Sequence, residues 1–249
     1  MHRFFVAPDC IDGDDAVVTG AVARQLSTVL RAAPGDRIAL LDDTGREYIV
    51  TLSRVGAREA AGTVIGRTDD GGVPSAKITL YQAVLKADRF EQVLQKCTEL
   101  GVATFVPVVA ERSVPRVGEN WASSRYPRWL RIITEAAEQS GRSRLPVLEE
   151  PMVLSAACDA AKGVCLIPWE EERDTGIRVA LREAGGYAMR ANGVSVFTGP
   201  EGGLTEHEVR HAASLGIVPV SLGTRVLRAE TAAMVAVAAV QYELGELGG

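Results

Sequence analysis

The sequence predicts an α/β protein with two parts: a small, mostly β domain over residues 1–72 and a larger domain over residues 73–249 with a mostly parallel sheet. Short apolar runs, turns and one helical pattern fill the first 70 residues. From Lys77 onward, strand and helix patterns alternate, as they do in doubly wound parallel sheets. Asp, Gly and Pro cluster over residues 69–75, which predicts a linker between the two parts.

Composition limits the class of protein. The chain has 249 residues, of which 47% are hydrophobic, and this is ample for a core. It has no uncharged apolar run of about 18 residues, so we expect no transmembrane helix. The first residues show no signal-peptide pattern, so we expect a cytoplasmic protein. The net charge of -5 argues against a generally basic nucleic-acid binder.

Cysteine and histidine are too sparse for a metal framework, and we expect no metal. The four cysteines form no close pair in the sequence, and only His207 and His211 share a helical spacing. Cys97 and Cys165 are expected to be buried, reduced thiols.

The first part reads as a small β-barrel. A helical period covers residues 21–31. Five strands are expected, over residues 3–6, 16–18, 37–41, 47–55 and 60–67. Barrels of this size often bind RNA on one face, although many have no such role.

The second part alternates strands with helices. Strands are expected over residues 78–85, 103–109, 163–168, 194–197 and 217–222. Helices are expected over residues 89–100, 121–140, 175–184 and 232–244. One further helix begins after Thr205, where Glu208 completes a capping box, and ends at Leu215.

Two glycine-bearing corners lie late in the chain, at residues 198–203 (Thr-Gly-Pro-Glu-Gly-Gly) and 223–231. Each follows an expected strand, and ligands bind at the carboxyl ends of strands in open parallel sheets. Glycine lets the backbone approach a ligand closely. The alternative is that both are ordinary turns between a strand and a helix.

The first corner does not fit a phosphate ligand. It lacks the Lys-Ser/Thr of a P-loop and the spacing of a dinucleotide fingerprint. Glu201 stands in its middle, where a carboxylate would repel a pyrophosphate. A ligand with adenosine and a positive centre fits better, and S-adenosylmethionine is such a molecule.

Arginine is concentrated between residues 112 and 144. This stretch holds three acids, Glu119, Glu135 and Glu138, against seven arginines, Arg112, Arg116, Arg125, Arg128, Arg131, Arg142 and Arg144. The pattern fits a phosphate-contacting surface or an ordinary solvated helix face, and the sequence does not separate the two.

Both corners resemble the signature loops of SPOUT methyltransferases. The upstream segments at residues 2–6, 86–91, 96–102 and 128–142 resemble the ribosomal RNA small-subunit methyltransferase E family. The resemblance covers the whole chain. It implies a PUA-like RNA-binding barrel over residues 1–72 and a SPOUT domain over residues 73–249. A deep trefoil knot would cover about residues 193–249.

The same resemblance implies an activity and partners. Members methylate N3 of a uridine in 16S rRNA near the decoding centre, with S-adenosylmethionine as methyl donor, and act as homodimers. The implied cofactor-binding residues are Thr198, Gly199, Pro200, Glu201, Gly202, Gly203, Leu222, Gly223, Val226, Leu227, Arg228 and Thr231.

Methylation at N3 requires loss of a weakly acidic proton, which a carboxylate could accept, and an arginine could stabilise the charge left on the uracil oxygens. Arg228 and Arg142 are candidates for contacts to oxygen or phosphate, and Glu138 for the base. Each candidate also has a structural alternative. Glu138 and Arg142 have the i,i+4 spacing of an ordinary ion pair on a helix surface. Glu230, which lies in the second corner beside Arg228, could stabilise the start of the helix that follows. The candidate RNA contacts are Arg3, Arg24, Arg31, Arg128 and Arg131.

Two other functions fit the same sequence. A ribose 2′-O-methyltransferase of the same superfamily would share both corners but modify a different atom. A non-catalytic ribosome-assembly factor would keep the arginines without binding the methyl donor.

Overall fold

The structure is a computed structural model that describes residues 1–69, 76–86, 88–114 and 121–248. The chain divides into two compact units. Unit 1 comprises Met1–Val73 and Ala137–Leu145, and unit 2 comprises Pro74–Ala136 and Pro146–Gly249. The sequence predicted a division after residue 72, and it did not predict that Ala137–Leu145 would belong to unit 1. Most of the expected linker, residues 70–75, lies outside the described residues.

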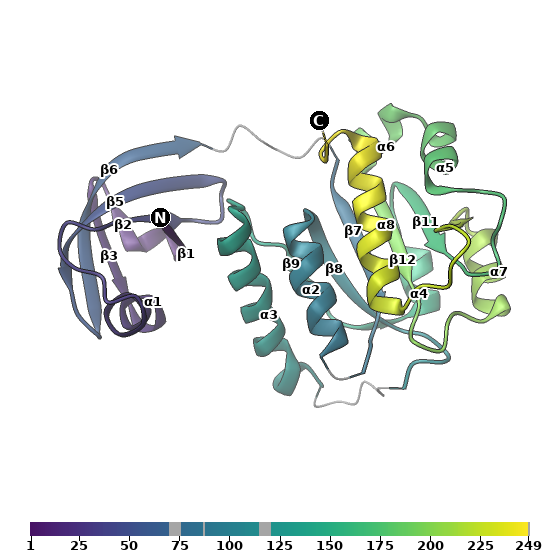
Figure 1. Ribbon diagram of the computed structural model, residues 1–249, viewed down its shortest axis with the longest axis horizontal. Helices are drawn as coiled ribbons and strands as arrows, with labels where there is room; N and C mark the ends of the chain where they lie inside the picture. The colour runs from purple at the N-terminus through teal and green to yellow at the C-terminus, as the bar shows by residue number, and fades with distance from the viewer. Residues whose placement is uncertain (70–75, 87, 115–120, 249) are drawn as a thin grey trace. The chain divides into compact units, whose positions relative to one another are not determined.

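Unit 1 contains a six-stranded mixed sheet with the strand order β1-β4-β5-β6-β3-β2 (Figure 1). Its first strand pairs in parallel with β4, and the other described pairs are antiparallel. The five expected strands are present, and β2 is an additional short one. The strands are β1 (His2–Phe5), β2 (Ile11–Asp12), β3 (Asp15–Thr19), β4 (Arg37–Leu41), β5 (Arg46–Val55) and β6 (Glu59–Asp69).

The helix expected over residues 21–31 is shorter and changes type midway. It runs as α1 (Gly20–Arg24) and continues as the π-helix η2 (Gln25–Val29). A short 3-10 helix, η1 (Pro8–Cys10), precedes it. Leu26 of η2 is fully buried in the core of this unit, which anchors the turn to the sheet.

Two hydrogen bonds hold the segment Ala137–Leu145 in unit 1. The backbone N–H of Phe5 donates to Glu138 Oε1 at 3.0 Å. The backbone N–H of Leu145 donates to Asp43 Oδ1 at 2.6 Å. These partners are more than 100 residues apart in the sequence, so no local pattern signals them.

Asp42 is a buried carboxylate whose loss should destabilise unit 1. Its oxygens accept hydrogen bonds from the backbone N–H and hydroxyl of Thr44, at 2.9 and 2.6 Å, and from the Tyr48 hydroxyl at 3.1 Å. Burial by itself raises the pKa of Asp42, but the hydrogen bonds from Thr44 and Tyr48 outweigh it and lower the pKa below its usual value.

We expect Asp42→Ala to lower the free energy of unfolding by about 2 kcal/mol at pH 7, because three hydrogen-bond donors lose their charged acceptor. Urea unfolding measures this. The folded state favours the ionised form of Asp42. The contribution of this carboxylate to the free energy of unfolding is therefore complete above the ordinary carboxyl pKa of about 4, and it is lost as the pH falls through the lower pKa of the folded state. The difference in stability between the variant and wild type should therefore shrink as the pH falls below about 4. The exposed Asp12→Ala is the control, and an equal loss in both variants would contradict the assignment.

Unit 2 contains a seven-stranded sheet in which every described pair is parallel. The order is β10-β8-β7-β12-β11-β13, with β9 paired to β8 (Figure 1). The five expected strands are present, and two short ones join them. The strands are β7 (Ile78–Ala83), β8 (Val102–Val109), β9 (Val147–Leu148), β10 (Met152–Val153), β11 (Val164–Pro168), β12 (Val194–Thr198) and β13 (Val218–Val220).

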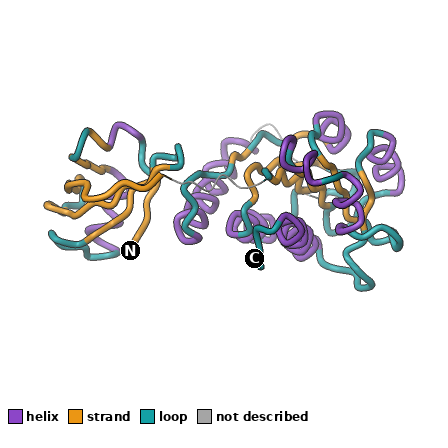
Figure 2. Tube along the Cα trace, turned by 90° about the horizontal axis from the view of Figure 1, so that it is seen from above, coloured by secondary structure: helices purple, strands orange, loops and turns teal. Residues whose placement is uncertain are grey.

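Helices cover both faces of this sheet (Figure 2). One core cluster packs helices α2, α3, α5, α6 and α8 against one face, and a second packs α4 and α7 against the other. The capping box of Thr205 and Glu208 at the start of α7 is confirmed. The helices are α2 (Arg89–Glu99), α3 (Trp121–Ser140), α4 (Leu154–Ala160), α5 (Ile177–Ala184), α6 (Gly186–Asn192), α7 (Glu206–Ser214) and α8 (Ala229–Leu244).

The four cysteines are free thiols. Cys97 is fully buried, and burial raises its pKa to about 12. The second fully buried cysteine is Cys158 and not Cys165, which is half-buried. The difference arises because Cys158 faces the sheet from α4, a helix that the sequence pattern did not predict. No helix in the described part of the chain is long and apolar enough to cross a membrane.

Candidate active site

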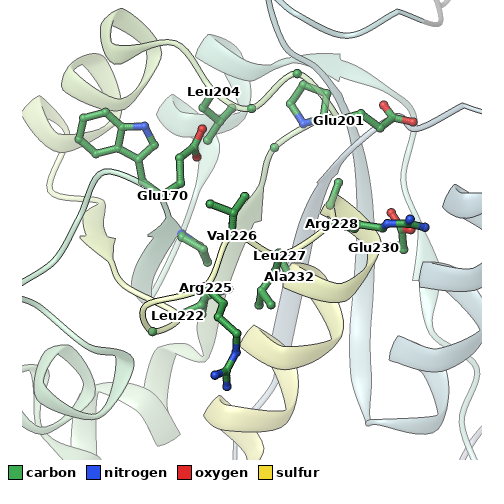
Figure 3. Close-up of a pocket in the computed structure, with 18 of the residues that line it drawn as sticks. Glu170, Glu201, Leu204, Leu222, Arg225, Val226, Leu227, Arg228, Glu230 and Ala232 are labelled. Atoms are coloured by element: carbon green, nitrogen blue, oxygen red, sulfur yellow. The ribbon is translucent and has the colours of Figure 1, made fainter.

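The cavity that we identify as the candidate active site lies in unit 2, at the carboxyl ends of the strands, and has a volume of about 450 Å³. Both glycine-bearing corners line it, although they come from different strands (Figure 3). A volume of this size accommodates a small organic cofactor. The expectation that the two corners jointly form one pocket is therefore confirmed.

The first corner, which we call loop A (residues 198–203), joins β12 to α7. Gly203 has φ +71°, a conformation that only glycine adopts without strain, and its N–H donates to the Pro200 carbonyl at 2.9 Å. Thr198 is buried under the loop, where its hydroxyl donates to Gln82 Oε1 on β7 at 2.6 Å. This bond fixes the base of loop A to the neighbouring strand.

Glu201 places a carboxylate at the centre of loop A, in the lining of the cavity. Its Oε1 accepts a hydrogen bond from the Lys86 backbone at 2.9 Å and lies 3.6 Å from the Arg89 guanidinium. Its Oε2 is buried and has no partner in the structure. The carboxylate therefore anchors the segment after β7 and keeps one oxygen available.

The second corner, which we call loop B (residues 222–231), joins β13 to α8. Gly223 has φ +107° and gives the loop its reversal. Val226 is 85% exposed, which is unusual for a valine. Arg228 is the N-cap of α8 but makes no capping bond with its side chain, and it extends to the same side of the cavity as Glu230 (Figure 3). Glu230 Oε2 is buried without a partner.

A third corner also lines the cavity, and the sequence reasoning missed it. It follows β11 and contributes Trp169, Glu170 and Arg173. The Trp169 N–H donates to the Val220 carbonyl at 3.0 Å, which ties this corner to the start of loop B. Glu170 lies against Gly203, where a side chain in place of hydrogen would meet its carboxylate at 2.6 Å. A feature of the sequence that could have indicated this corner is Trp169, which directly follows the expected strand over residues 163–168.

Ten of the twelve expected cofactor-binding residues line the cavity. They are Gly199, Pro200, Glu201, Gly202, Gly203, Leu222, Gly223, Val226, Leu227 and Arg228. The other two, Thr198 and Thr231, do not line it. Thr198 instead holds the loop from beneath through Gln82.

The lining carries charges of both signs. Three carboxylates, Glu170, Glu201 and Glu230, stand among four guanidinium groups, Arg89, Arg173, Arg225 and Arg228. In Figure 3, Glu170 lies on one wall, and Glu201, Arg228 and Glu230 lie toward the other. This mixture suits a ligand that bears a sulfonium, an ammonium and a carboxylate, and it does not resemble a site for polyphosphate. The residues present therefore fit S-adenosylmethionine.

The three expected catalytic residues divide between the two units. Arg228 lines the cavity in unit 2, whereas Glu138 and Arg142 belong to unit 1. There, Glu138 accepts the N–H of Phe5. Arg142 is half-buried, and desolvation lowers the pKa of its guanidinium. Glu138, which the spacing suggested as one member of a catalytic pair, therefore helps to attach a segment of unit 1.

The expected RNA-contacting arginines differ in their partners. Arg3 pairs with Glu47 at 3.2 Å, Arg128 with Glu91 at 2.6 Å and Arg131 with Glu135 at 3.6 Å. Within the described residues, the side chains of Arg24 and Arg31 form no ion pair. Of the arginine-rich stretch, Arg116 lies outside the described residues, and Arg112 donates to the Gly202 carbonyl at 3.0 Å.

His207 and His211 line a second, smaller cavity with Glu208. Glu208 is already engaged by the Thr205 and Glu111 backbones. Among the described residues, no three side chains of His, Cys, Asp or Glu gather as a metal site.

Comparisons with known proteins agree with this fold. Residues 73–241 match the family model described as an RNA methyltransferase domain, which is the class that the sheet and the loop pocket define. A crystal structure of a ribosomal RNA small subunit methyltransferase E from Neisseria gonorrhoeae, bound to S-adenosyl methionine, is similar with a TM-score of 0.86 and 32% identity, and 97% of each chain is covered. A putative methyltransferase from Legionella pneumophila, also in complex with this cofactor, gives a TM-score of 0.81 at 27% identity over 96% of each chain.

Similarity in sequence extends over the full chain. The ribosomal RNA small subunit methyltransferase E of Bacillus subtilis is 31% identical over 256 residues, which cover 100% of this chain and 99% of that protein. Its counterpart from Synechocystis is 34% identical over 244 residues, or 96% of this chain and 77% of that protein. The chain belongs to the ribosomal RNA small subunit methyltransferase E family.

Proposed function

We propose that this protein transfers a methyl group from S-adenosylmethionine to N3 of a uridine in 16S rRNA near the decoding centre. The observation that carries the proposal is the cavity between loops A and B, which has glycine-rich walls, three carboxylates and no phosphate-binding loop. The family membership and the two cofactor-bound relatives support the choice of methyl donor and of a ribosomal RNA substrate.

Backbone groups of loops A and B and the third corner would hold S-adenosylmethionine. When bound, it would supply an electrophilic methyl group on a positively charged sulfur. The role left to the protein is to hold the uracil in line and to remove the N3 proton. Arg228, exposed at the edge of the cavity, would donate to a uracil carbonyl oxygen, where charge accumulates as N3 loses its proton.

A carboxylate would take the N3 proton, and we compare Glu138 and Glu230, which stand close in the sequence to the candidate arginines Arg142 and Arg228. Glu201 also lines the cavity, but it already accepts the Lys86 N–H and lies beside the Arg89 guanidinium. Glu230 lines the cavity with Arg228 and has a buried oxygen without a partner. Glu138 has one oxygen engaged by Phe5 N–H. We therefore favour Glu230 as the base and assign Glu138 to the attachment of Ala137–Leu145.

We expect Glu230→Gln to lower kcat for rRNA methylation by about 10²-fold or more, because an amide cannot accept the proton. Glu138→Gln is the matched variant, since its amide oxygen can still accept the Phe5 N–H, and it should keep kcat within about threefold. Single-turnover methylation of 16S rRNA at saturating donor measures both. Loss of kcat in the Glu138 variant alone would reverse the assignment.

A strain from which the gene for this protein has been deleted tests the proposed reaction. Nucleoside analysis of its 16S rRNA by mass spectrometry should show loss of 3-methyluridine, and the wild-type gene should restore it. Loss of a 2′-O-methylated nucleoside instead would favour the ribose methyltransferase. An unchanged nucleoside profile, together with no donor binding by the purified protein, would favour the assembly factor.

We also propose a cytoplasmic homodimer with a PUA-like barrel in unit 1 and a trefoil knot over about residues 193–249. Exposed apolar side chains on loop B and α8, namely Val226, Val235 and Tyr242, support a partner surface on unit 2. Light scattering after size-exclusion chromatography should give twice the chain mass.

A further inference from the structure

The end of the η2 turn in unit 1 carries an exposed apolar side chain that two arginines flank in the sequence. Val29 is 71% exposed, more than Ile65 at 51% or Val17 at 41% in the same unit. Arg24 precedes the π-helical turn and Arg31 follows it. We call Arg24, Val29 and Arg31 the η2 tip.

The backbone holds this tip in an uncommon conformation. The N–H of Leu30 donates to the Gln25 carbonyl and that of Ala32 to the Leu26 carbonyl, both at 2.9 Å, so the turn is wider than an α-helix. Arg31 has φ +52°, which is strained for a residue with a side chain. Wide turns and strained residues of this kind concentrate at functional sites.

Charge pairing distinguishes the η2 tip from four other arginines of unit 1. Arg3, Arg46, Arg54 and Arg67 each form an ion pair with a carboxylate. Within the described residues, the side chains of Arg24 and Arg31 form none; Arg37 and Arg58 also form none, but they do not flank an exposed apolar side chain of the η2 turn. The acid that follows them, Asp36, accepts the Ala33 backbone N–H at 2.8 Å. The tip therefore presents unneutralised positive charge in a protein of net charge -5.

We infer that the η2 tip is an RNA-contact site of unit 1, in which Arg24 and Arg31 bind phosphates and Val29 packs against an unpaired base. Charge complementarity selects a polyanion, and the exposed valine favours one with an accessible apolar face. Single-stranded loops of RNA offer both. The inference rests on the proposed function, because it names where the rRNA substrate is held.

Binding to an unmodified 16S rRNA transcript tests the inference, measured by filter binding from 50 to 200 mM salt. Val29→Ser should weaken binding about fivefold through loss of apolar contact. Arg31→Gly should weaken it about tenfold and lower the slope of log K against log salt by about 0.7, the value for one phosphate contact on a single strand. Because glycine relieves the strain at φ +52°, the melting temperature should not fall.

Matched controls come from the same unit. Ile65→Ser removes another exposed apolar side chain, and Arg58→Ala removes an exposed arginine that forms no ion pair within the described residues. Both should bind RNA within twofold of wild type, and no variant should change the affinity for S-adenosylmethionine. Equal losses in the controls, or wild-type binding by both tip variants, would overturn the inference.

Two further outcomes are informative. If the tip variants methylate assembled subunits poorly but bind the bare transcript normally, the tip contacts a ribosomal protein and the inference is wrong. If the wild type itself fails to methylate the rRNA, the proposed function fails, and this is distinguishable because the binding measurements do not depend on turnover.

Discussion

Replacing Arg228 by alanine should reduce methylation severely while the protein stays folded. Arg228 is exposed and lines the cavity, and its side chain makes no capping bond to α8, so little stability depends on it. Loss of one donor to the charge that develops on the uracil oxygens should lower kcat by about 10²- to 10³-fold. Single-turnover transfer of labelled methyl to 16S rRNA measures this.

Affinity and folding serve as the internal controls for Arg228→Ala. We expect S-adenosylmethionine binding within about threefold of wild type and an unchanged melting temperature. Arg210→Ala removes an arginine from the exposed i,i+4 pair with Glu206 and should be silent. Near-normal turnover in Arg228→Ala would remove this residue from the mechanism.

Replacing Gly163 by alanine should give the largest loss of stability in unit 2. Gly163 begins the approach to β11 with φ +76°, and an added Cβ would overlap the backbone carbonyl oxygens of Gly193 and Asn192. Neither obstacle is a flexible side chain, so the sheet itself must shift. Backbone strain and overpacking together should lower the free energy of unfolding by about 3 kcal/mol or more.

Gly186→Ala provides the comparison for Gly163→Ala. Gly186 is the first residue of α6 and has no atom within 4 Å of an added Cβ. Alanine there should leave the urea midpoint unchanged or raise it. If the two variants unfold at the same urea concentration, the packing of Gly163 against residues 192–193 is not as described.

The two loops could be predicted because their signals are local. A buried strand, a glycine-rich break and a capping box follow one another at residues 194–208, and the structure keeps each of them. Alternation of strand and helix likewise predicted the parallel sheet. Helix α4 was missed because its seven residues are too few to establish a helical period.

What could not be predicted depends on contacts between distant segments. The spacing of Glu138 and Arg142 indicated a pair on one helix face, but it could not show that Glu138 would accept the N–H of Phe5. The third corner, with Trp169 and Glu170, carries no glycine motif and reaches the cavity only through the sheet order that places β11 between β12 and β13. Likewise, no local pattern tells that Arg3 pairs with Glu47 or Arg128 with Glu91, because these partners are distant in the sequence.

The central claim is that loops A and B together bind a methyl donor that carries no phosphate. Isothermal titration of the purified protein with S-adenosylmethionine, and separately with ATP, tests this most directly. We predict one donor bound per chain, competition by S-adenosylhomocysteine, and no binding of ATP. Absence of heat with S-adenosylmethionine, or displacement of it by ATP, would contradict the account.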